Sequence, residues 1–92
     1  MSEFHFVAVL LDSPGRADKD MVIEQLNRAN DWIEFRDRSW LIWTKQSSKT
    51  WYGRLKPVLA KGDNVFVCAV DINDRGGLMP RSFWDFVRKK TG

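Results

Sequence analysis

Apolar residues run without interruption through two short stretches of the chain, FVAVLL and VFVCAV. Continuous apolar runs of this length are typical of strands that are covered on both faces. Pro14 and Gly15 follow the first run closely, and residues of this kind end regular structure. We therefore predict one strand at residues 4–11 and another at residues 64–70, both in the interior of a sheet.

The segment WIEFRDRSWLIWT between these strands has the pattern of a hairpin. Residues 32–36 alternate between apolar and polar side chains, and residues 40–44 are rich in β-favouring types. The polar residues 37–39 separate the two runs. Two such runs joined by about three polar residues predict a pair of antiparallel strands.

Three further segments have helical patterns. Apolar residues at helical spacing predict a helix from Asp18 or Asp20 to about Asn30. A second helix is expected to begin at Ser47 or Ser48 and to be kinked or divided at Pro57, which cannot donate a backbone hydrogen bond. The last helix is expected at residues 81–89, with Pro80 in its first turn.

The predicted order β-α-β-β-α-β, followed by a helix, favours an α+β ferredoxin-like sandwich that occupies residues 1–92 as one domain. In this arrangement we expect the first and last strands in the middle of the sheet and the first two helices on one face. The other face then needs a cover, because aromatic side chains must point toward it. The C-terminal helix, a second subunit or nucleic acid could supply that cover.

Composition restricts the classes of function. The net charge of +3 permits contact with nucleic acid, although charges of both signs are mixed along most of the chain. Cys68 is the only cysteine, so no intrachain disulfide can form. It lies in an apolar run and is expected to be buried. No signal peptide or membrane span is recognisable, so we expect a cytoplasmic protein with no membrane partner.

Several segments resemble those of a known family: LLDSPGR, DRSWLIWT, GDNVFVCAV and GGLMPRSFWDFV. Two spacings carry most of the similarity, D-x-x-W-[LI]-[IV]-x-T beginning at Asp37 and G-x-x-P-x-x-x-W beginning at Gly77. On these residues the chain resembles the small SinR-like proteins, which are related to the ferredoxin-like subunit of the CRISPR spacer-integration complex. The similarity covers residues 4 to about 87.

The resemblance implies a homodimer and an aspartate at the end of the first strand, a position that Asp12 occupies here. In the CRISPR relatives, this carboxylate can lie near its symmetry mate and has been linked to divalent-metal-dependent cleavage of RNA or DNA. In other members the protein clamps duplex DNA while a partner carries out the chemistry. The relatives usually have an aromatic residue before the aspartate, where this chain has Leu11.

Asp12 therefore has two interpretations. One carboxylate per chain, doubled by a two-fold axis, could hold a hydrated Mg²⁺ that polarises a phosphodiester. Alternatively, the carboxylate accepts backbone N–H bonds in the turn that follows it. Asp71 is expected at the opposite end of the sheet, so it would not share a metal with Asp12. The only histidine, His5, begins the first strand, which leaves no histidine base near Asp12.

Five basic residues are candidates for contact with phosphate: Arg16, Arg36, Arg38, Lys45 and Lys49. From their positions, either the hairpin turn and the residues after it form one positive end of the sheet, or these residues belong to a solvated surface of mixed charge. The first functional hypothesis is a dimeric module that binds duplex DNA, RNA or a protein and lacks a complete catalytic set. The second is a metal-dependent endonuclease that uses paired Asp12.

Overall fold

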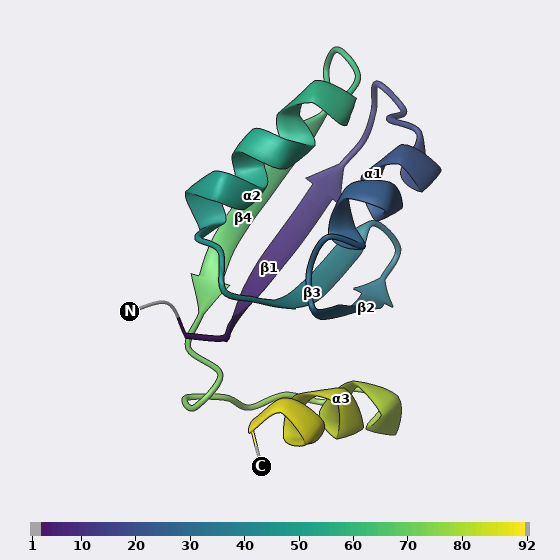
Figure 1. The fold of residues 1–92 in the computed structure, drawn as a ribbon. Helices are drawn as coiled ribbons and strands as arrows, with labels where there is room; N and C mark the ends of the chain where they lie inside the picture. Colours follow the sequence, from purple (N-terminus) through teal and green to yellow (C-terminus); the bar gives the residue numbers. More distant parts are fainter. Residues whose placement is uncertain (1–2, 92) are drawn as a thin grey trace.

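In the computed structural model, which describes residues 3–91, the chain forms a four-stranded antiparallel sheet and three α-helices (Figure 1). In chain order the elements are β1 (His5–Asp12), α1 (Lys19–Leu26), β2 (Asp31–Arg36), β3 (Ser39–Thr44), α2 (Ser48–Leu55), the short 3-10 helix η1 (Lys56–Val58), β4 (Asn64–Val70) and α3 (Arg81–Thr91). The predicted order of elements is confirmed. This α+β architecture is compatible with a ferredoxin-like sandwich, although the strands are not arranged as expected.

The strands lie in the order β2-β3-β1-β4, so the prediction that the first and last strands are central is wrong. β1 lies between β3 and β4, with Phe6 opposite both Trp43 and Val70. β4 is an edge strand, and within its apolar run only Val65, Val67 and Val70 are partly covered. Cys68 is exposed rather than buried, because it lies on the uncovered side of this edge strand.

Helices α1 and α2 cover the first face of the sheet, as predicted (Figure 1). The core between these helices and the sheet contains Trp40 and Trp51, whose side chains are fully buried. The indole Nε1 of Trp51 donates a hydrogen bond of 3.0 Å to the Thr44 hydroxyl. This bond satisfies a polar group that would be costly to bury alone, and it fixes α2 over the sheet.

Helix α3 covers part of the second face, which is the face opposite α1 and α2. Val87 of α3 is fully buried in a cluster with Phe6 and Leu41. Lys90 forms an ion pair of 2.7 Å with Asp31 at the start of β2, and a hydrogen bond from Lys90 lowers the pKa of that carboxyl. Of the three covers that the sequence left open, the C-terminal helix is thus the one observed. It lies at the end of the sheet where β1 begins, and leaves the other end open (Figure 1).

The helix boundaries follow local signals. Asp18 caps α1, since its carboxylate accepts a hydrogen bond from the Asp20 N–H. The helix ends at Leu26, four residues before the predicted end, as Asn30 already bonds to the Trp43 carbonyl. Ser47 caps α2, and Pro57 converts its end into η1, which confirms the predicted interruption. Within residues 3–91, no helix combines the length and apolarity needed to cross a membrane.

Candidate functional site

Asp12 ends β1 at the uncovered end of the second face. Its side chain is exposed, and within residues 3–91 its carboxylate forms no ion pair or side-chain hydrogen bond. A hollow of about 330 Å³ lies beside it, lined by Leu10, Leu11, Asp12, Arg36, Ser39, Asn64, Val65 and Phe66. The hollow therefore presents one free carboxylate and one guanidinium on a partly apolar floor, and both groups are open to a ligand.

The turn after β1 is held by Asp63 and Ser13, so the interpretation of Asp12 as its hydrogen-bond acceptor is wrong. Asp63 accepts hydrogen bonds from the Ala60 N–H at 2.8 Å and from the Ser13 hydroxyl at 3.1 Å. The Ala17 N–H donates to both Asp63 and the Ser13 hydroxyl. Residue 63 follows Gly62, whose φ of 91° turns the chain back toward this site.

Burial alone would raise the pKa of Asp63, but hydrogen bonds from Ala60, Ser13, Gly15 and Ala17 outweigh it and lower the pKa. A carboxyl with a lowered folded-state pKa stabilises the fold above its unfolded pKa of about 3.9. The stabilisation is lost as the pH falls through the folded-state pKa. Asp63 is thus a structural residue that the sequence did not reveal, although KGDN marks a turn.

The described residues of one chain do not assemble a complete metal site. No group of three or more His, Cys, Asp or Glu side chains within residues 3–91 is placed to hold an ion. The register pairs Asp12 with Asn64 and Phe6 with Val70, so Asp71 lies at the other end of β4 as expected. A metal at Asp12 would therefore need ligands from a second copy or from a substrate.

The five predicted phosphate contacts fall into two groups. Arg16, Arg36 and Arg38 lie at the Asp12 end of the sheet, where Arg38 donates to the Ala17 carbonyl at 3.2 Å. β3 runs from there to the other end, where His5 pairs with Thr44, so Lys45 lies near the start of β1. Lys49 lies on α2, beside the β4 edge of the sheet. The expectation of a single positive end is wrong, because the length of β3 separates Lys45 from the three arginines and Lys49 lies on the helix that covers the sheet.

A basic surface lies instead on and around α2. The chain has six Lys or Arg residues and no Asp or Glu between residues 38 and 62, and this segment includes all of α2 and η1. Lys49 and Lys56 are exposed, seven positions apart. Burial and the neighbouring charge of Arg28 lower the pKa of Arg54, whose guanidinium lies 4.9 Å from the Trp51 ring centroid. The absence of acidic residues from this segment is visible in the sequence itself.

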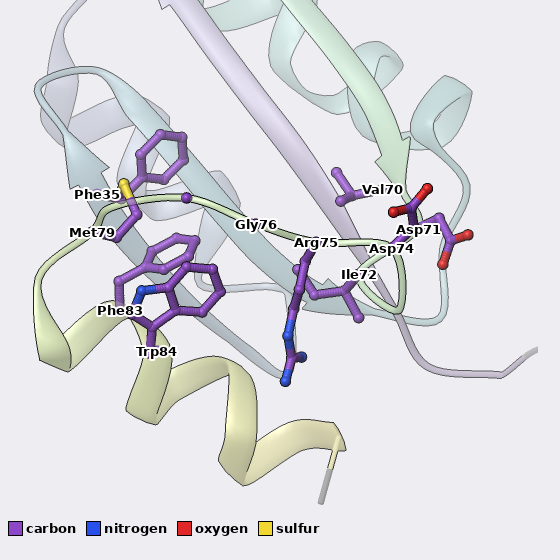
Figure 2. Close-up of a pocket in the computed structure, with 11 residues that line it drawn as sticks. Phe35, Val70, Asp71, Ile72, Asp74, Arg75, Gly76, Met79, Phe83 and Trp84 are labelled. Atoms are coloured by element: carbon purple, nitrogen blue, oxygen red, sulfur yellow. The ribbon is translucent and has the colours of Figure 1, made fainter.

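A second hollow of about 330 Å³ lies between the loop after β4, β2 and α3 (Figure 2). On one side the aromatic rings of Phe35, Phe83 and Trp84 gather with Met79, and on the other side Asp71 and Asp74 face solvent. The rings of Phe35 and Phe83 pack edge to face with centroids 5.7 Å apart. This packing anchors α3 to the sheet, and none of the predicted site residues lines this hollow.

The G-x-x-P-x-x-x-W spacing has a structural role at this hollow. Gly77 has a φ of 156°, and a Cβ there would lie 3.8 Å from the Trp84 ring. Pro80 directly precedes α3, one position before the first turn in which it is expected from the sequence. These residues therefore set the path by which the loop enters the helix.

Comparisons with protein families, with curated protein sequences and with solved structures find no match to this chain. The resemblance to the SinR-like proteins therefore stays a prediction. The functional argument that follows depends on the geometry described above.

Proposed function

We propose that this chain is a nucleic-acid-binding module with a ferredoxin-like fold, an added C-terminal helix and no catalytic set of its own. The observation that supports the proposal best is the basic surface of α2 and η1. Its exposed side chains include Lys49 and Lys56, with Lys45 just before the helix. Lys and Arg that neutralise phosphates release counterions, which drives the association of such surfaces with nucleic acid.

The same surface favours contact with the phosphate backbone over reading of bases. Its groups are Lys side chains on a short helix, with Arg54 partly buried against Trp51. Lysine ammonium groups act as mobile point charges, and contacts of this kind fix position without specifying sequence. We therefore expect salt-dependent binding with little preference among sequences.

Replacing both Lys49 and Lys56 with glutamine tests this function. The double variant should reduce the slope of log K against log salt by about two units and weaken binding roughly tenfold or more at low salt. Fluorescence anisotropy with labelled DNA and RNA across a salt series measures both quantities. A double variant that retains the wild-type slope, or a wild type that binds neither nucleic acid at low salt, would contradict the proposal.

Replacing Arg81 and Lys89 with glutamine gives a matched control. Both residues are exposed on α3, which packs on the second face. The control removes the same charge as the test variant, so it separates a contact with α2 from a general effect of net charge. We expect its salt slope to stay close to that of the wild type.

A second candidate function is a metal-dependent endonuclease that uses Asp12 from two copies of the chain. The observation that favours it is the exposed, unpartnered carboxylate of Asp12 in the hollow at the open end of the second face. Leu10 and Phe66 supply apolar surface there, and Asp12 and Arg36 supply opposite charges. A two-fold axis through this end could pair each carboxylate with the opposite guanidinium, or bring two carboxylates to one Mg²⁺.

The two candidates differ in their response to Asp12→Asn and Phe66→Asp. A nuclease requires that Asp12→Asn abolish cleavage of RNA or DNA in Mg²⁺ or Mn²⁺. A dimer through this end of the sheet requires that Phe66→Asp give monomers by light scattering. Equal cleavage by wild type and Asp12→Asn, or cleavage in the presence of a chelator, excludes the endonuclease.

A further inference from the structure

The two edges of the sheet differ in how well they are protected. β2, at one edge, carries the charged residues Asp31, Glu34 and Arg36, and its pairing with β3 shifts register between the last two. Lys19 forms an ion pair of 2.7 Å with Glu34. Charged side chains and bulges of this kind prevent another strand from adding to an edge.

β4, at the other edge, has none of these protections. Its apolar run at residues 65–70 contains no charged residue and no proline. Its pairing with β1 keeps one regular register from Asn64 to Val70. Among residues 3–91, no strand lies on its outer side, so that side presents a row of backbone donors and acceptors. Strand addition is a recurring way in which an edge of this kind binds a peptide.

A groove runs between α2 and this edge, which lie side by side in Figure 1. It has a volume of about 310 Å³ and is lined by Ser48, Lys49 and Tyr52 of α2 and by Val65, Phe66 and Val67 of β4. Lys49 is exposed, and Tyr52 is 43% exposed. The groove therefore combines an open strand edge with a cation and an aromatic ring on the helix beside it.

We propose that the outer edge of β4 accepts an extended acidic peptide segment of a partner protein as a fifth strand of the sheet. The backbone of β4 would supply the hydrogen bonds. Because side chains alternate between the faces of a strand, every second residue of the peptide would lie against α2, where Lys49 favours Asp or Glu. The alternate residues of the peptide would lie on the side of Phe66, a residue that is 61% exposed, and should be apolar.

A second copy of this chain suits the same edge poorly. Antiparallel pairing of two β4 strands about a two-fold axis would place both α2 helices on the same face, close to the axis. Each α2 and its flanks carry only basic charges, so the two copies would repel each other. An acidic peptide removes this repulsion. Nucleic acid can match the charge, but it lacks the regular backbone N–H and C=O groups that a strand edge pairs with.

The test uses a fluorescein-labelled octapeptide of alternating Glu and Val, and a matched octapeptide of alternating Lys and Val. We expect the Glu–Val peptide to bind, and the Lys–Val peptide to bind at least about tenfold more weakly. N-methylation of every second residue of the Glu–Val peptide removes the donors on one side of the strand. One of the two possible N-methylated forms should lose binding, and the other should keep it, because an added strand pairs on one side only.

Substitutions in the protein complete the test. Lys49→Glu should reverse the preference between the two peptides, whereas Lys89→Glu on α3 should not. Absence of binding at about 1 mM Glu–Val peptide, or an unchanged preference in Lys49→Glu, would overturn the proposal. A concentration-dependent dimer that the peptide cannot dissociate would overturn it in favour of a second copy. The result does not depend on the binding of nucleic acid, since the anisotropy assay with labelled DNA and RNA reports on that separately.

Discussion

Replacing Gly15 with alanine is expected to lower the free energy of unfolding by about 3 kcal/mol. A Cβ at residue 15 would lie 2.1 Å from the Lys61 carbonyl oxygen and 2.9 Å from a carboxylate oxygen of Asp63. The first contact involves a backbone atom, so neither rotamer change nor side-chain movement can relieve it. The turn after β1 and the turn before β4 would have to separate, which would break the hydrogen bonds of Asp63. Urea denaturation followed by tryptophan fluorescence measures the loss.

Gly53→Ala provides the matched control. Gly53 lies within α2, and a Cβ there would meet no atom within 4 Å. Alanine favours the helix by roughly 0.5–1 kcal/mol relative to glycine, so this variant should be slightly more stable than the wild type. If Gly15→Ala and Gly53→Ala had equal stabilities, the close approach of the two turns would be contradicted.

The turns that meet at Gly15 show where sequence patterns stop being informative. Ser13, Pro14 and Gly15 correctly predicted a turn after the first strand, because their backbone preferences are local. The partner of that turn, Asp63, is far away in sequence, and no local pattern links the two. The same limit explains why one of the two interpretations of Asp12 makes it the acceptor in this turn. The carboxylate nearest in sequence is exposed, and a distant one makes the bonds.

The strand order shows a second limit. The run at residues 65–70 is as apolar as the run at residues 6–11, and both patterns predict burial on two faces. Only the pairing of strands decides which run is central, and pairing is not visible in either run alone. As a result, Cys68 was predicted to be buried and is exposed. The positive charge of the segment around α2 can be read from the sequence without knowledge of the tertiary structure. This part of the candidate interface is therefore predictable from the sequence.

Among substitutions at the second face, Val87→Asp is expected to cause the largest loss of stability. Val87 is fully buried between α3 and the sheet, in the cluster that contains Phe6 and Leu41. An unpaired carboxylate there would cost about 4 kcal/mol or more, which the helix can avoid by leaving the sheet. We therefore expect α3 to detach while the core beneath α1 and α2 stays folded. Hydrogen exchange should show fast exchange of α3 amides and retained protection in β1 and β3.

Ser82→Asp places the same charge on the same helix at an exposed position and serves as the control. It lies in the first turn of α3, where a negative charge is favourable, so α3 should stay protected. Detachment in Val87→Asp would uncover Phe6, Leu41 and Trp43, which should increase the binding of the hydrophobic dye ANS. Loss of protection throughout the sheet would instead mean that the two faces unfold as one unit. In that case α3 would be part of the same cooperative unit as the core beneath α1 and α2.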